Sequence, residues 1–221
     1  MRIHKEGRST LGIFLIAGSG MVTLAWLIIN TLWICLLISL IVVSGFSFTM
    51  LFFRSPERAI ELLDNSIIAP ADGLVVAIQE EDEAEFFKDK RIKVSIFMSG
   101  ADVHINWMPV SGEVSYFRYF SGKHLFARNP KSSHLNEHTS IGIKTTDGNQ
   151  LLIKQIAGIM ARRVVSYVQP GQEVFQGEEL GFIKLGSRVD LFLPINTQVS
   201  VSTGQIVSGR QTVLAKWPES C

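Results

Sequence analysis

Four of the five histidines lie close together in the chain, and imidazole is both a common zinc ligand and a proton carrier. They fall within 35 residues: His104, His124, His134 and His138. The last two are four residues apart, which would place both on one face of a helix, but Pro130 and the β-like residues from Thr139 onward argue against a long helix there. Neither a His-Glu-x-x-His motif nor paired cysteines accompany them, so we predict no metal site.

Serine chemistry is the second candidate. The chain has no Gly-x-Ser-x-Gly nucleophile elbow, and Ser99-Gly-Ala-Asp102 does not replace one. The Gly-Lys-Ser/Thr phosphate loop and the Gly-x-Gly-x-x-Gly dinucleotide motif are also absent, so nothing predicts nucleotide binding. The serine-containing segment that these exclusions leave to consider is Leu185-Gly186-Ser187. Taken alone, this common tripeptide is typical of a turn between two strands.

The elements that must position these residues begin with an apolar segment. Ser9 to Phe53 is a run of 45 residues without a charged side chain, far beyond the ~18 that make a membrane-spanning helix a candidate. We predict a transmembrane hairpin in residues 1–53, with helices over Leu11–Ile29 and Leu32–Phe53 and a turn at Asn30-Thr31. One long tilted span or a shallow re-entrant pair is the alternative.

Basic residues flank both ends of this run, with Arg2, Lys5 and Arg8 before it and Arg54 and Arg58 after it. Because Lys and Arg flanks stay on the cytoplasmic side, an even number of crossings satisfies both ends. We therefore expect a cell-membrane protein whose remaining part lies at the cytoplasmic face. A cleaved signal peptide would have a much shorter apolar core of about 7–15 residues.

Residues 54–221 show short β-like runs between turn signals, so we expect a mainly β domain. Asp147-Gly148 between two apolar runs predicts a hairpin, and the acidic Glu80–Glu85 segment is expected to be a solvated loop or short helix. The rhythm of the C-terminal third resembles a biotinyl/lipoyl barrel-sandwich without its modified lysine. The predicted runs are Leu74–Ile78, Ile92–Met98, Val114–Phe120, Ser140–Thr145, Gln150–Ile156 and Arg163–Val168.

Composition limits the partners. The net charge is +1, from 21 Lys and Arg against 20 Asp and Glu, which gives no reason to expect nucleic acid. Two cysteines, Cys35 and Cys221, are too few for a disulfide framework. The sequence leaves the oligomeric state open.

A series of short motifs gives the Gly186-Ser187 pair a context. In their order they resemble the proenzymes of the pyruvoyl-dependent phosphatidylserine decarboxylase family, in its short membrane-associated form. The resemblance covers roughly Phe53 to the C-terminus. The motifs are Phe53-Arg-Ser-Pro56, Ala69-Pro-Ala-Asp-Gly73, Phe97-Met-Ser-Gly-Ala-Asp-Val-His104, Met108-Pro109, Gly112, Asn136-Glu137, Gln155-Ile-Ala-Gly158, Ala161-Arg162, Gly177-x-x-Leu-Gly-Phe182 and Leu185-Gly-Ser187.

The resemblance implies that the protein cuts its own Gly186-Ser187 bond. The products would be a β chain, 1–186, and an α chain, 187–221, which stay associated, and Ser187 would become a pyruvoyl group. That group would form a Schiff base with the serine amine of phosphatidylserine and accept the electron pair left by CO₂, giving phosphatidylethanolamine.

Residue roles also come from the resemblance. His104 matches the family's proton-transfer position, and Asp72 would orient and charge-stabilise it. Asp102 is a weaker candidate, on the face of His104 only if the segment is a strand. Without the resemblance, Asp72 would be read as a turn residue and His104 as a core histidine.

The chain departs from longer family members at two positions. Trp107 stands where they commonly have a second histidine, and His138 where they often have an arginine. A two-histidine mechanism is therefore not carried over. As a hypothesis, His138 contributes to headgroup binding or proton transfer.

Three alternatives stay open. The first is the same chemistry on archaetidylserine or another serine phospholipid. The second is a non-catalytic, membrane-anchored β domain that binds a lipid or a partner, with Gly186-Ser187 as a turn. The third is a pyruvoyl enzyme acting on a soluble amino acid, which would leave the apolar run without a purpose.

Overall fold

The computed structural model describes residues 2–59, 65–123, 125–127, 132–159, 163–184 and 186–218. The predicted positions His124, Ala161-Arg162, Leu185 and Cys221, and the side chain of His134, lie outside the described residues. The chain divides into two compact units, Met1–Glu57 and Arg58–Cys221.

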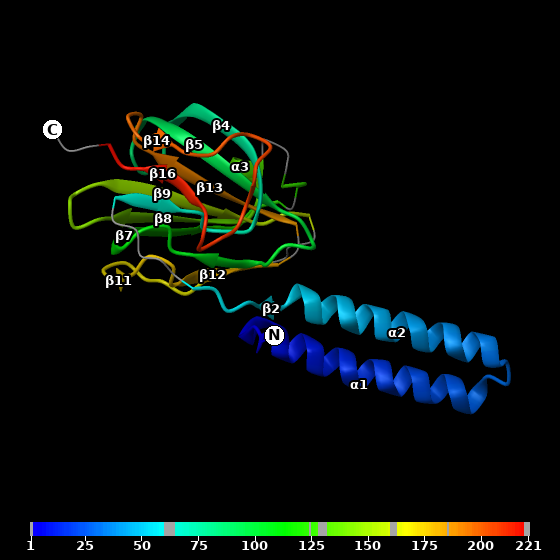
Figure 1. Ribbon diagram of the computed structural model, residues 1–221. Helices are drawn as coiled ribbons and strands as arrows, with labels where there is room; N and C mark the ends of the chain where they lie inside the picture. The colour runs from blue at the N-terminus through cyan, green and yellow to red at the C-terminus, as the bar shows by residue number, and fades with distance from the viewer. Residues whose placement is uncertain are drawn as a thin grey trace. The chain divides into compact units, whose positions relative to one another are not determined.

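The first unit is a helical hairpin made of α1 (Lys5–Ile28) and α2 (Leu32–Phe52) (Figure 1). Short strands β1 (Arg2–Ile3) and β2 (Arg54–Ser55) pair antiparallel at its open end. Both helices are long and apolar enough to cross a membrane, and their large side chains point outward, with Leu27 78% and Trp33 77% exposed. The predicted helical hairpin is confirmed, although α1 begins at Lys5 rather than Leu11, and the single long span is wrong because the helix breaks at residues 29–31. That the hairpin crosses the membrane stays a prediction.

Small residues let the two helices approach closely. A Cβ added at Gly18 would lie 2.8 Å from a Val42 methyl carbon, and one added at Gly45 would lie 2.9 Å from the Phe14 ring. The Trp26 indole N–H also donates to the Ser39 hydroxyl across the pair at 3.3 Å. Close backbone approach and interhelical hydrogen bonds are what hold helices together where the surroundings are as apolar as the helices.

The second unit is mainly β, as predicted, and its strands pair antiparallel. An eight-stranded, strongly curled sheet runs in the order β11-β7-β8-β9-β13-β5-β4-β15, and two three-stranded sheets, β10-β12-β6 and β14-β16-β3, complete it (Figure 1). The bounds are β3 Ser66–Ile68, β4 Gly73–Glu83, β5 Asp89–Met98, β6 Ile105–Trp107, β7 Gly112–Phe120, α3 Ser132–Leu135, β8 His138–Lys144, β9 Gln150–Ile156, β10 Val164–Ser166, β11 Glu173–Val174, β12 Glu179–Ile183, β13 Ser187–Leu193, β14 Gln198–Val199, β15 Ile206–Val207 and β16 Val213–Lys216.

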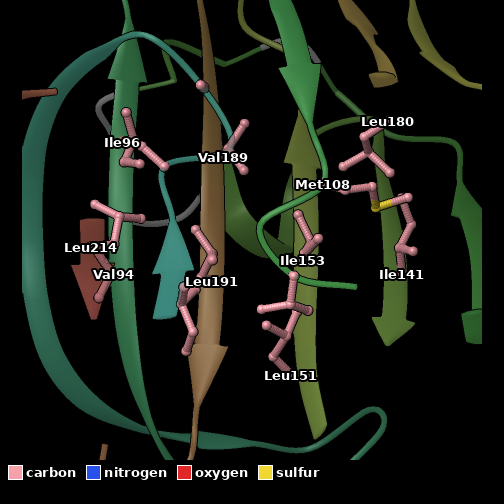
Figure 2. Close-up of a cluster of buried hydrophobic side chains, with 14 of the residues drawn as sticks. Val94, Ile96, Met108, Ile141, Leu151, Ile153, Leu180, Val189, Leu191 and Leu214 are labelled. Atoms are coloured by element: carbon pink, nitrogen blue, oxygen red, sulfur yellow. The ribbon is translucent and has the colours of Figure 1, made fainter. Parts of the chain in front are cut away.

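The core lies against the inner face of the large sheet. Alternate residues of each strand point to that face, and in β13 these are Val189, Leu191 and Leu193, all fully buried. Figure 2 shows Val189 and Leu191 among side chains from neighbouring strands and from the smaller sheets, including Leu180 of β12 and Leu214 of β16. Interdigitation of these faces closes the barrel-sandwich-like domain.

One segment departs from its prediction. Glu80–Glu83 belong to β4 and pair with β5, and the Glu83 side chain is buried, so the expectation of a solvated loop or short helix was wrong. Basic residues on the facing strand explain the outcome: Lys93 forms an ion pair with Glu81, and Lys90 lies 4.0 Å from Glu80. Opposite charges across two strands offset the low strand propensity of glutamate.

Candidate active site

Ser187 is the first residue of β13 and pairs with Met98 of β5. It is fully buried, and its hydroxyl donates to the Met98 sulfur at 3.3 Å. Because side chains alternate along a strand, Ser187 points to the same inner face as Val189 and Leu191. The candidate nucleophile therefore stands at the edge of the core, away from bulk water.

Gly186, the residue before it, has φ +67°, in the left-handed region that a glycine enters without a Cβ penalty. Its carbonyl packs directly against Gly158. A Cβ built on Gly158 would lie 1.5 Å from the Gly186 oxygen and 3.3 Å from the Ala127 Cβ. Both glycines are therefore needed for the path of the peptide bond between Gly186 and Ser187.

His104 is fully buried in the extended segment that leads into β6. Its Nδ1 lies 2.8 Å from the Asp102 backbone oxygen. A carbonyl oxygen only accepts hydrogen bonds, so Nδ1 carries the hydrogen, and in the neutral ring Nε2 is the basic nitrogen. That tautomer suits a side chain that takes up a proton through Nε2.

A line of buried polar side chains runs from Met98 across three strands. Asn106 of β6 donates to the Met98 sulfur at 3.6 Å, and its amide oxygen accepts from Gln155 of β9 at 2.8 Å. Thr139 of β8 donates to Gln155 at 2.9 Å. Asn106 is two residues after His104 in the chain and joins this polar line to Ser187 through the Met98 sulfur. The approach of His104 itself to Ser187 stays a prediction.

Asp72 has other partners than the one we predicted. Arg58 forms a two-pronged ion pair with its carboxylate, at 2.5 and 2.7 Å, and the Gly209 N–H donates to it at 2.7 Å. The Arg58 guanidinium also lies 5.1 Å from the centre of the Trp107 ring. The carboxylate thus ties the start of the second unit to the turn at Gly209, and a direct role in orienting His104 stays a prediction.

Asp102 stabilises a turn. Its carboxylate accepts from the N–H and the hydroxyl of Ser99, both at 2.7 Å. The segment is not a strand, so the condition under which the Asp102 side chain would share a face with His104 is not met. Asp102 contacts the histidine through its backbone oxygen instead.

His138 begins β8 and lies opposite Ile156, which in turn lies opposite Arg188. This register puts the His138 side chain on the outer face of the sheet, whereas Ser187 points to the inner face. The ring stacks on Phe120 at 4.5 Å and borders a cavity of about 270 Å³ that Lys154 also lines. The structure therefore does not bring His138 and Ser187 together.

The comparisons with known proteins bear on this arrangement. A family model for phosphatidylserine decarboxylase matches residues 46–215. The chain belongs to the phosphatidylserine decarboxylase family. It is 50% identical to the phosphatidylserine decarboxylase proenzyme of Cytophaga hutchinsonii over 82% of this chain and 81% of the relative. For the proenzymes of Amoebophilus asiaticus and Porphyromonas gingivalis, identity is 42% and 38%, and at least 96% of each chain is covered.

The motifs that carry the family resemblance converge in space. Met98, Asn136, Gly158 and Gly181 come from four different motifs, and each makes a contact around the Gly186-Ser187 bond or the polar line beside it. Asn136 donates to the Ala157 oxygen at 2.7 Å, next to Gly158. A Cβ on Gly181 would lie 2.9 Å from the Gln155 amide nitrogen.

Sequence reasoning gave no site role to Arg58, Met98, Asn106 or Arg188 of this decarboxylase-family chain, although Arg58 was noted as a flanking charge and Met98 lies within a quoted motif. Arg188 was readable as a signal, because a charged residue directly after the candidate cleavage site, within an apolar strand, needs a partner. Met98 and Asn106 carried no such signal, since their contacts depend on strand register. The structure shows no group of three or more His, Cys, Asp or Glu that could bind a metal among the residues it describes.

Proposed function

We propose that the protein is a phosphatidylserine decarboxylase that is made as a proenzyme and cuts itself between Gly186 and Ser187. The observation that carries the proposal is the buried Ser187 hydroxyl, next to a Gly186 in left-handed conformation, in a chain whose relatives are named proenzymes. The substrate is taken from those names. The products would be a β chain, 1–186, and an α chain, 187–221.

In the cleavage, the Ser187 oxygen attacks the Gly186 carbonyl carbon, and an ester replaces the peptide bond. Elimination of that ester and loss of ammonia on hydrolysis leave a pyruvoyl group at the start of the α chain. The Met98 sulfur is a weak acceptor, so the hydroxyl loses little when it turns from Met98 toward the carbonyl. His104 would receive the hydroxyl proton at Nε2, since its Nδ1–H faces the Asp102 oxygen.

The surroundings of Ser187 fit the pyruvoyl group. It would stand at the buried start of β13, with the Asn106 and Gln155 amides nearby through Met98, in a place that excludes bulk water. When present, such a group supplies an electron sink for the pair released with CO₂. The chain itself would hold the lipid headgroup, exclude water and return a proton through His104.

The hairpin suits a lipid substrate. Two apolar helices with exposed Leu and Trp side chains are what a membrane anchor requires, and a diacyl lipid presents its headgroup only at the membrane surface. Arg2, Lys5, Arg8 and Arg54 flank the hairpin at one end, which favours the cytoplasmic face of the cell membrane.

The test is the mass and the activity of the purified full-length chain. We expect wild type to yield two chains, the smaller beginning at residue 187 with a blocked N-terminus, and to release phosphatidylethanolamine from phosphatidylserine vesicles. Ser187→Ala should stay one chain of 24.6 kDa and be inactive. Ser200→Ala, an exposed serine elsewhere in the α chain, is the matched control and should cleave normally.

A folded wild-type chain that stays intact would overturn the proposal and leave a non-catalytic membrane-anchored domain as the better description. Vesicles with archaetidylserine in place of phosphatidylserine separate the lipid backbones within the same assay.

A further inference from the structure

The residue after the proposed cleavage site is a buried arginine. Arg188 is 3% exposed and points to the outer face of the large sheet, opposite to Ser187. Its Nε lies 2.8 Å from one Asp190 carboxylate oxygen, and its Nη2 lies 3.0 Å from the other. The remaining nitrogen, Nη1, donates to the Ala127 backbone oxygen at 2.8 Å.

Two serines complete this cluster. Ser133 is hydrogen-bonded to Arg188 and also donates to Asp190 at 3.0 Å, and Ser132 donates to the Ala127 oxygen at 3.1 Å. All four side chains are buried. We refer to Arg188, Asp190, Ser132 and Ser133, with the Ala127 carbonyl, as the arginine clamp.

The clamp joins the two sides of the proposed cleavage site. Arg188 and Asp190 would belong to the α chain, whereas Ala127, Ser132 and Ser133 would belong to the β chain. Ala127 also lies beside the Gly186 carbonyl. A Cβ built on Gly158 would lie 1.5 Å from the Gly186 oxygen and 3.3 Å from the Ala127 Cβ. Ala127 and Gly158 therefore form the wall against which the Gly186 carbonyl rests.

We propose that Arg188 is a positioning residue for self-cleavage. By holding the Ala127 carbonyl, its guanidinium fixes the wall behind the Gly186 carbonyl and thereby the angle at which the Ser187 hydroxyl meets that carbon. The inference rests on the proposed cleavage between Gly186 and Ser187. After cleavage, the same contacts tie the new N-terminus of the α chain to the β chain.

The chemistry of the clamp calls for arginine rather than lysine. A guanidinium presents its N–H donors in a rigid plane. In Arg188, Nη2 donates to the Asp190 carboxylate and Nη1 to the Ala127 carbonyl, while Nε lies at ion-pair distance from the second carboxylate oxygen. An ammonium group in the same place keeps the charge but cannot reach all of these acceptors with that geometry. Arg188→Lys should therefore act as a partial substitute and Arg188→Met as none.

The experiment follows the rate at which the newly made full-length precursor splits, together with the melting temperature of each variant. We expect Arg188→Met to cleave about a hundredfold more slowly, the cost typical of a small misplacement of a reacting group. Arg188→Lys and Ser133→Ala should fall between it and wild type. Arg91→Lys is the matched control, because Arg91 makes a two-pronged pair with Asp89, also two residues away, but far from the cleavage site.

Leu193→Ala, at the other end of β13 and fully buried, separates positioning from loss of stability. It should lower the melting temperature without slowing cleavage in proportion. If Arg188→Met does not fold, the inference is tested by the cleavage rates of the other two variants. Ser133→Ala and Arg188→Lys should both cleave more slowly than wild type. The inference is overturned if folded Arg188 and Ser133 variants cleave like wild type, or if they slow no more than Leu193→Ala at equal melting temperature. A wild type that never cleaves removes the proposed function as well, which is a different result.

Discussion

The two faces of β13 are buried by different means. On the inner face, Val189, Leu191 and Leu193 pack into a continuous apolar core. On the outer face, Arg188 and Asp190 are just as buried but pair with each other and with backbone and hydroxyl groups. Apolar burial is non-directional, whereas a buried ion pair requires one geometry. The strand thus carries the candidate nucleophile on its apolar face and a directional contact on the other.

The neighbouring strand β9 repeats the contrast. Leu151 and Ile153 point inward, while Lys154 points outward and pairs with Glu83 at 3.0 Å and Glu85 at 2.9 Å. Replacement of a whole buried pair by apolar residues is often neutral for stability, whereas removal of one partner alone is strongly destabilising. We expect changes at the wall of the Gly186 carbonyl, Gly158 and the arginine clamp behind it, to affect cleavage most. Changes at outer-face positions away from that wall, such as Lys154, should affect stability most.

The largest effect is expected for Gly158→Ala. The new Cβ would lie 1.5 Å from the Gly186 oxygen, so the carbonyl that the Ser187 hydroxyl must reach has to move. Cleavage should slow by about a hundredfold or more, measured as conversion of precursor over time. Gly12→Ala, where a Cβ meets nothing within 4 Å, is the control. A Gly158→Ala precursor that cleaves at the wild-type rate would show that this wall does not shape the cleavage site.

Lys154→Met should mainly change stability. Removing the cation leaves two carboxylates in or near the buried layer, which typically costs about 3–5 kcal/mol, measurable by urea unfolding at neutral pH. Lys144→Met, an exposed lysine on the adjacent strand β8, should cost little. Folded Lys154→Met should still cleave, and a block of cleavage without loss of stability would break the comparison between the faces.

The same pair gives a pH dependence. Burial disfavours the charged form of Glu83, but hydrogen bonds from the backbone of Phe87 and Phe86 and from Lys154 outweigh it, so its pKa lies below 4.5. Its contribution to stability is present above 4.5 and is lost as pH falls through the lowered pKa. In Lys154→Met the uncompensated carboxylates take up protons more readily, so the stability gap to wild type should narrow as pH falls toward 4.5.

Much of the fold could be predicted because it depends on local pattern. The uncharged run and its polar interruption at Asn30 predicted the hairpin, and strand β9, Gln150–Ile156, was predicted with its observed bounds. The prediction of a solvated loop at Glu80–Glu85 was wrong because it rested on acidic composition alone. The basic partners Lys90, Lys93 and Lys154 come from other parts of the chain.

The site was predictable only where a motif named the residue. Ser187 and His104 came from the family resemblance, but the Arg58 partner of Asp72 lies 14 residues away along the chain, in a segment where only charge was visible. The Ser187 contact with Met98 depends on the register between β13 and β5, which no local pattern specifies. Partners set by register or by long-range pairing were therefore the part that sequence could not supply.

The smallest effect on cleavage is expected for His138→Ala. The side chain faces away from Ser187, so the rate at which the precursor splits should stay at the wild-type value. Loss of the ring stacked on Phe120 should cost about 0.5–1.5 kcal/mol of stability, and His138→Phe, which keeps an aromatic ring there, should recover most of it.

Turnover of phosphatidylserine by the cleaved variant then decides the hypothesis that His138 contributes to headgroup binding or proton transfer. The hypothesis is supported if turnover falls in His138→Ala and does not recover in His138→Phe, because the phenylalanine ring keeps the stacking but lacks the imidazole nitrogens. An uncleaved His138→Ala precursor that is still folded would contradict both the hypothesis and the separation of the two faces.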